Sequence, residues 1–237
     1  APLAARLLET GGLAASFRTL GTAFALAFLL LVPMLLPSGS RPVPPEQAGP
    51  GLPPDRMVRS RPFRSLYLSF LLATAIGLSL IGLSAPLAST YTLPDFLPAL
   101  SLFALFNGLG RPLFGWISDR FGPDRAMALS FGLILTASLL MTVAGSRPAV
   151  FLTAFCLYWM NLGAWLSMAP AATRRLFGSR HYTANYGIVF TAYGVGAVSG
   201  VTLSGILLDL TGSGALFPAI AILALAGLMS RLMPPDR

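Results

Sequence analysis

The sequence predicts an all-α membrane protein, a polytopic bundle of seven transmembrane helices. Hydrophobic residues make up 55% of the 237 residues and charged residues only 10%, against about 25% charged residues in an ordinary soluble domain. The mean hydropathy is +0.74, so polar side chains are too few to cover a globule of this size in water. This composition excludes a soluble enzyme, a disordered chain and a disulfide scaffold.

Seven apolar stretches are each close to the roughly 20 residues that cross a bilayer. Each must be helical, because lipid cannot satisfy the backbone groups of an open structure. In chain order the predicted spans are residues 14–36, 66–90, 97–116, 126–144, 149–171, 185–208 and 215–233. Residues 1–12 indicate either the tail of a further helix or an outside loop. The chain starts with Ala1 and shows no signal-peptide pattern, so we expect it to begin inside a longer protein.

A proline-rich linker is predicted between the first and second spans, at residues 37–65. It holds eight prolines and five arginines, and proline at this density predicts a disordered or extended segment. We therefore divide the chain into residues 1–36, the last helix of one bundle, residues 37–65, a cytoplasmic linker, and residues 66–237, a second bundle of six helices.

Arginine is distributed unevenly along the chain, which contains 16 arginines, no lysine and 8 acidic residues. Twelve of the arginines lie in the linker, in the connections around residues 120–125 and 173–181, and in the C-terminal tail, whereas the opposite connections hold only Arg147. A basic chain can bind nucleic acid, but arginine clusters between apolar runs fit the positive-inside rule better. We therefore expect an integral protein of a bacterial inner membrane with a cytoplasmic C-terminus and no nucleic-acid partner.

The end of the third span carries the pattern G-x-x-x-D-R-x-G-x-x-R, which resembles the loop signature of the major facilitator superfamily. The matching residues, expected to form a conformational or gating motif, are Gly115, Asp119, Arg120, Gly122 and Arg125. Glycine at the first position allows two helices to approach closely, and the second glycine permits a tight turn. The aspartate suits a helix N-terminus, and the arginines suit helix C-terminal carbonyls. Pro123 and Asp124 depart from the family, which usually has basic residues there.

Two further stretches narrow the resemblance to the oxalate/formate antiporter-like branch. Residues 185–197 are similar to its eleventh helix, residues 107–112 to its eighth and residues 18–21 to the start of its sixth. The resemblance implies helices six to twelve of a twelve-helix transporter, with helices one to five missing. A basic linker followed by six helices in hairpins agrees with two six-helix halves.

Arg111 is the main candidate for binding a substrate. It precedes Asp119 by eight residues, which puts it about 12 Å deeper along the helix and inside the hydrocarbon zone, where a charge costs several kcal/mol without a cavity or partner. None of the eight acids lies at that depth. In the branch that the sequence resembles, an arginine at this place binds the substrate carboxylate. A structural pair with an acid of the missing half, or snorkelling to the surface, is the alternative.

Three groups of polar and aromatic residues accompany Arg111. Asn107 shares its helix face, one turn away, and either orients the guanidinium, contacts substrate or joins two helices. Tyr186, Phe190 and Tyr193 form one stripe on the sixth span, typical of packing or of a cavity wall. On the fifth span Tyr158, Asn161 and Trp165 are weaker cavity candidates. The oxalate carriers have a lysine in place of Tyr193, and this chain has no lysine, so the one fixed cation favours a monocarboxylate over oxalate. A second cation supplied by helices one to five is the alternative.

A last sequence feature is a seam of small residues on the sixth span, Gly196, Gly200 and Ser204, which predicts close helix packing.

The sequence therefore predicts a secondary carrier of small organic anions, mono- or dicarboxylates, that works by alternating access with the missing half. Proton symport and anion exchange both fit. A carrier of a sugar, drug or other metabolite, or a seven-helix receptor, is the alternative. We expect no enzyme, cofactor or metal site, because His181 is the only histidine, Cys156 is the only cysteine and lysine is absent.

Overall fold

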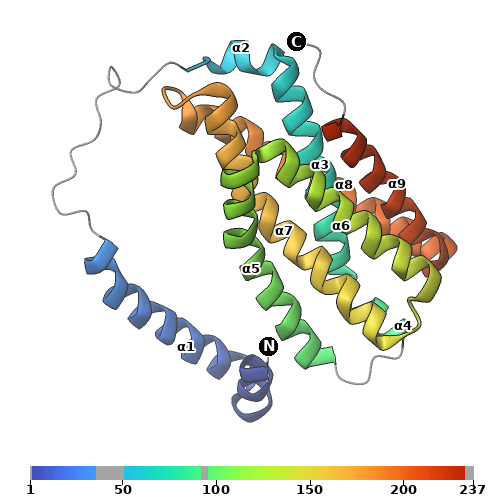
Figure 1. Cartoon of the computed structure of the whole chain (residues 1–237). Coiled ribbons are helices and arrows are strands. Elements are labelled where there is room, and N and C mark those ends of the chain that lie inside the picture. The colour runs from blue at the N-terminus through green and yellow to red at the C-terminus, as the bar shows by residue number, and fades with distance from the viewer. Residues whose placement is uncertain (1, 36–50, 92–95, 233–237) are drawn as a thin grey trace. The chain divides into compact units, whose positions relative to one another are not determined.

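The computed structural model describes residues 2–35, 51–91 and 96–232 (Figure 1). Within them, seven helices are long and apolar enough to cross a membrane, as the sequence predicts. Their bounds lie within six residues of the predicted spans, except where the second predicted span ends. The chain divides into two compact units, Ala1–Ala48 and Gly49–Arg237.

The first unit contains α1 (Pro2–Leu35), a helix that bends at Gly12, where φ is 69° and ψ is 179°. Helix continues on the N-terminal side of this bend, so of the two expectations for residues 1–12 the tail of a further helix agrees with the structure. The membrane-spanning part, Gly11–Val32, has only 6% of its residues buried. This helix therefore has almost no packing of its own within the unit.

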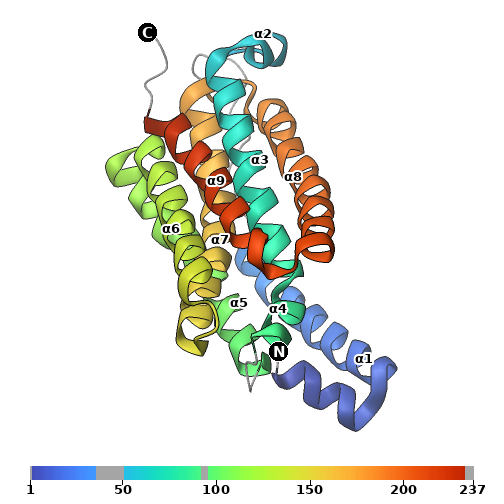
Figure 2. The same cartoon turned by 90° about the vertical axis from the view of Figure 1, so that its right-hand side faces the viewer.

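The second unit is a bundle of long helices with two short ones at its ends (Figures 1 and 2). Its elements are α2 (Pro54–Arg59), α3 (Arg61–Gly82), α4 (Ser84–Thr90), α5 (Phe96–Phe121), α6 (Pro123–Ala144), α7 (Pro148–Phe177), α8 (Tyr182–Thr211) and α9 (Ser213–Leu232). Helix α5 packs on α7, α3 on α8, and α6 on both α7 and α9. In the most apolar 18-residue window of each helix, buried residues make up 56% in α3 and 61% in α7 but only 17% in α5 and in α8, so α3 and α7 form the core and α5 and α8 flank it.

The second predicted span, residues 66–90, is broken in the structure. Helix α3 ends at Gly82, Leu83 leaves helical geometry with φ −88° and ψ 1°, and α4 begins at Ser84. Pro86 explains the break, because proline has no N–H to donate and its ring clashes with the carbonyl four residues earlier, here that of Gly82.

Glycine lets α5 and α7 touch backbone to backbone. A Cβ on Gly110 would meet the Met160 carbonyl of α7, and a Cβ on Gly163 would meet the Asn107 carbonyl of α5. Space around Gly115 is open for at least 4 Å, so the close helix approach expected there lies instead, in the described part of the chain, at Gly110 and Gly163.

The predicted seam on α8 is confirmed. A Cβ on Gly196 would lie 2.7 Å from the carbonyl oxygen of Leu71, and one on Gly200 would lie 2.6 Å from the Cα of Ala75. Ser204 is buried on the same side of α8. Only hydrogen fits at the two glycine positions, which brings α8 directly onto α3.

The end of the predicted linker folds against the bundle. Leu52 donates its N–H to the Phe177 carbonyl at 2.8 Å and accepts a hydrogen bond from Asn185 Nδ2 at 2.9 Å. Met57, on the short helix α2, is fully buried. The expectation of a disordered or extended linker is therefore wrong for residues 51–59, because these contacts compensate for the prolines, two of which sit where a helix starts. Residues 37–50 lie outside the described residues.

One end of the bundle carries most of its arginines. At this end, α5 and α6 meet at Gly122, with φ +91°, and α7 and α8 meet at Gly178, with φ +80°. We call it the arginine-rich end; the exposed arginines of these two connections are Arg120, Arg125, Arg174, Arg175 and Arg180.

Candidate functional site

Helix α5 has two different exposed faces in addition to the face that packs on α7. One carries large apolar side chains that are 39% to 62% exposed: Leu102, Leu105, Leu109, Leu113 and Trp116. The other carries small or polar residues at the same helical spacing: Ser101, Ala104, Gly108, Arg111, Gly115 and Asp119. The large apolar side chains of the first face are suited to contact with lipid acyl chains. We call the second face, which lies on a different side of the helix, the polar face of α5.

Arg111 lies in the middle of the polar face and its side chain is exposed. In the described part of the chain, its guanidinium has no hydrogen-bond or ion-pair partner. At the depth that the sequence predicts for Arg111, a permanently charged group requires water, a counter-ion or a ligand. A guanidinium offers five N–H donors in a planar fork, which matches the two oxygens of a carboxylate.

Asn107 does not orient Arg111 in this structure. Its Nδ2 donates a hydrogen bond of 2.9 Å to the backbone carbonyl of Trp159 on α7. Of the three roles predicted for Asn107, the structure shows the contact between helices. The bond lies beside the Gly110 and Gly163 crossing, so it fixes the position of α5 on α7 one turn away from Arg111.

The aromatic residues predicted as a stripe on α8 form a continuous row of rings. The ring centroids of Tyr186 and Phe190 are 5.6 Å apart, and those of Phe190 and Tyr193 are 5.1 Å apart with planes only 6° from parallel. Tyr182 extends the row by stacking on Tyr186 at 5.9 Å. Phe190 is 40% exposed. We call Tyr186, Phe190 and Tyr193 the aromatic wall.

Comparison with known proteins agrees with this architecture. The family model of the Major Facilitator Superfamily matches residues 1–166 and, in a second match, residues 88–237. The chain belongs to the Major Facilitator Superfamily. With seven apolar helices of membrane-spanning length, it is an integral membrane protein.

Three curated proteins are similar to this superfamily member. The oxalate:formate antiporter of Oxalobacter formigenes is 23% identical over 84% of the chain and 49% of that protein. An uncharacterized 38 kDa protein of Thermoproteus tenax is 30% identical over 76% of the chain and 47% of its own length. The uncharacterized MFS-type transporter YfnC of Bacillus subtilis is 28% identical over 57% and 32%. The chain thus spans about half the length of the first two relatives and less of the third.

The superfamily loop motif forms the turn between α5 and α6. Gly122 adopts the left-handed conformation that a tight turn needs and donates its N–H to the Ser118 carbonyl at 2.9 Å. Asp119, Arg120 and Arg125 are exposed. In the part of the chain that the structure describes, Asp119 does not bond to a helix N-terminus, and the two arginines hold no helix carbonyl. These expected contacts are therefore not formed here.

A pocket at the arginine-rich end brings Asp119 close to two arginines of α7. Its lining includes Asp119 and Ser118 from α5 and Arg174 and Arg175 from α7. Within the described residues, no ion pair joins Asp119 to either arginine. The carboxylate is thus available to a partner at the end of the bundle.

Arg231 forms a contact that the sequence analysis missed. From the last turn of α9, its Nη1 pairs with Asp124 Oδ1 of α6 at 3.4 Å, and its Nη2 donates to the Ser65 carbonyl of α3 at 2.5 Å and to the Ser65 hydroxyl. Asp124, which stands where the family usually has a basic residue, therefore pairs with Arg231. No sequence signal predicts the pair, because 107 residues separate its members.

The predicted cavity candidates on α7 are buried instead. Tyr158 shares a 2.9 Å hydrogen bond with Ser138 of α6, and Trp165 Nε1 donates to Ser130 Oγ at 2.8 Å. Ser130 in turn donates to Asn161 Oδ1. The prediction that these three side chains face a cavity is wrong, because all three are buried and the Tyr158 hydroxyl, Trp165 Nε1 and Asn161 Oδ1 join α7 to α6. Asn161 Nδ2 is buried without a hydrogen-bond partner among the described residues.

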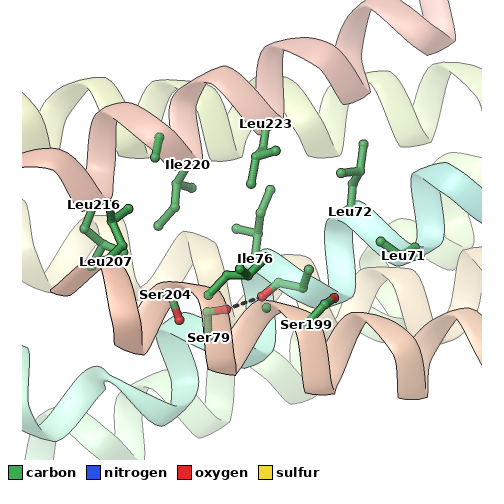
Figure 3. Close-up of a pocket in the computed structure, with 14 residues that line it drawn as sticks. Leu71, Leu72, Ile76, Ser79, Ser199, Ser204, Leu207, Leu216, Ile220 and Leu223 are labelled. Carbon is green, nitrogen blue, oxygen red and sulfur yellow. Dashed lines mark hydrogen bonds between the residues drawn. The ribbon is translucent and has the colours of Figure 1, made fainter. Parts of the chain in front are cut away.

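A separate groove between α3, α8 and α9 is apolar (Figure 3). The hydroxyls of Ser79, Ser199 and Ser204 each bond a carbonyl of their own helix, at 2.5, 2.7 and 3.2 Å. The remaining lining is aliphatic or glycine. Without a charged group or a free polar group, this groove is unsuited to an anion.

Proposed function

We propose that this chain forms the C-terminal half of a secondary carrier for small organic anions and that Arg111 binds the substrate carboxylate. The observation that carries the proposal is the position of Arg111 on the polar face of α5, away from the leucine and tryptophan face and without a partner among the described residues.

Physical chemistry favours a ligand over lipid beside Arg111. A charge near the middle of the bilayer costs several kcal/mol unless it faces water or an opposite charge. The polar face offers small neighbours, such as Gly108 and Gly115, whose surroundings are open for at least 4 Å. A carboxylate that enters this space gains two parallel charge-assisted hydrogen bonds.

The aromatic wall supports a small and partly apolar substrate. Tyr193 carries a hydroxyl that has no hydrogen-bond partner in the described residues, and the chain has no lysine. One cation and one phenol match one carboxylate, so a monocarboxylate fits this half better than oxalate. The name of the Oxalobacter formigenes relative, an oxalate:formate antiporter, agrees with small carboxylates as the substrate class and does not distinguish mono- from dicarboxylates.

Alternating access is the proposed mechanism. The substrate binds at Arg111 near the midplane, and two halves rock around it. Asp119, exposed at the arginine-rich end, latches one state against a helix of the other half. The excess of arginine at this end favours a cytoplasmic location for it and for the C-terminus, in a bacterial inner membrane.

The test is transport of labelled formate and of labelled oxalate into vesicles that contain the carrier expressed from its full reading frame. We expect Arg111→Ala to abolish uptake with normal membrane insertion, and Arg147→Ala, at an exposed arginine of the α6–α7 connection, to leave uptake unchanged. Unaltered uptake by Arg111→Ala would remove the site assignment. Ligand binding without accumulation would instead support a receptor.

A further inference from the structure

We propose that Phe70 is a positioning residue: from α3 it holds the rings of Phe190 and Tyr193 in the orientation that receives the substrate. This inference rests on the proposed function, because it assigns the support of the aromatic wall rather than the wall itself.

Phe70 lies directly behind the aromatic wall. Its ring centroid is 6.2 Å from that of Phe190 and 6.3 Å from that of Tyr193, at interplanar angles of 48° and 51°. Phe70 is fully buried, whereas Phe190 is 40% exposed. In the described part of the chain, the rings that contact Phe190 and Tyr193 are each other, Tyr186 and the ring of Phe70 behind them.

Phe70 is itself held by the core of the bundle. Trp165 of α7 stacks on it with centroids 5.9 Å apart and planes 14° from parallel. The indole of Trp165 is fixed in turn by its hydrogen bond to Ser130 and by the edge of Phe131, whose centroid is 5.5 Å away. Trp165 is fully buried.

These contacts form one continuous series from α6 through α7 and α3 to α8. Ser130 accepts a hydrogen bond from Trp165 Nε1 and donates one to Asn161 Oδ1. These two bonds fix the Ser130 hydroxyl, which in turn fixes the orientation of the indole. Aromatic rings have few rotamers and prefer definite mutual angles. Without the ring of Phe70, the side chains of Phe190 and Tyr193 can rotate. Affinity for substrate then falls, because the aromatic wall is no longer preorganised for binding.

The experiment compares Phe70→Leu with Phe151→Leu in the full-length carrier, using formate uptake into vesicles. Phe151, near the start of α7, is a matched control because it is also fully buried among aromatic rings. It contacts two rings, those of Tyr91 and Phe155, and neither belongs to the aromatic wall. We expect Phe70→Leu to raise KM about 2- to 10-fold, the equivalent of one ring contact of the two that Phe70 makes with the wall, with a smaller change in maximal rate per inserted carrier. Phe151→Leu should leave KM unchanged.

Two further variants test the same proposal if Phe70→Leu does not insert into the membrane. Ser130→Ala removes the hydrogen bond that orients the indole, Trp165→Phe replaces the indole with a ring that cannot form that bond, and both should raise KM. Equal KM in these variants, in Phe70→Leu and in the control would overturn the positioning role. Loss of uptake in Arg111→Ala alongside that result would leave the proposed function standing, whereas unaltered uptake in Arg111→Ala would remove the function itself.

Discussion

Arg231 and Asp124 form an ion pair whose two side chains have very different surroundings: the arginine is 5% exposed and the aspartate 71%. Coulomb attraction to an exposed carboxylate is weak because water screens it. The larger contribution comes from the bonds of Arg231 to Ser65, which tie α9 to α3 at the arginine-rich end.

The two members of this pair should therefore differ in their effect on stability. We expect Asp124→Asn to lower the free energy of unfolding by at most about 1 kcal/mol, and Arg231→Ala to lower it by about 2–4 kcal/mol because it removes buried charge-assisted bonds. Thermal unfolding in detergent of the two variants measures both. Equal losses would show that the ion pair, and not the bond to α3, carries the contribution.

The crossing of α5 and α7 should tolerate no Cβ at Gly110. Because an added methyl group meets the Met160 carbonyl, Gly110→Ala should separate the helices and destabilise the protein by about 1–3 kcal/mol. Gly108→Ala is the control two residues earlier, where space is open for 4 Å and alanine has the higher helix propensity. Melting temperatures that fall equally in both variants would argue against the close approach.

The folded end of the linker should depend on Asn185. Asn185→Ala removes the hydrogen bond to the Leu52 carbonyl, so we expect trypsin to cleave after Arg56 and Arg59 faster than in the parent protein, because local opening exposes these bonds more often. Thr183→Ala, at an exposed position in the same first turn of α8, is the control. Cleavage rates that match between the two variants would mean that Asn185 does not hold this segment.

Substrate preference should respond to a second cation in the aromatic wall. We expect Tyr193→Lys to raise the ratio of oxalate to formate uptake by about tenfold or more, since a charge-assisted hydrogen bond contributes about 1.5–3 kcal/mol. Tyr182→Lys, at the end of the ring row near the arginine-rich end, should leave the ratio unchanged. An unaltered ratio of oxalate to formate uptake in Tyr193→Lys would show that Tyr193 does not contact the substrate.

The sequence predicts the local features of this protein well, and the structure shows why. Each span is specified by its own residues, because a helix that crosses lipid must satisfy its backbone bonds internally. The same locality explains the turn at Gly122 and the seam at Gly196 and Gly200, where the requirement for glycine is visible in the chain.

Contacts between distant residues account for the predictions that were wrong or missed. Asn185 binds Leu52 across 133 residues, and Arg231 binds Asp124 across 107. A polar residue on an apolar helix, such as Asn161, has the same appearance in the sequence whether it faces a cavity or a neighbouring helix. Its partner Ser130 decides between the two, and only the packing of α6 on α7 identifies that partner.

The sequence alone determined the seven helices and the uneven distribution of arginine, since hydropathy and composition are properties of single segments. The tertiary structure alone decided that Asn107 joins α5 to α7, that Gly110 rather than Gly115 marks the close crossing, and that Phe70 supports Phe190 and Tyr193. Each of these depends on which side chains two helices bring together, and that pairing is set by packing rather than by any one segment.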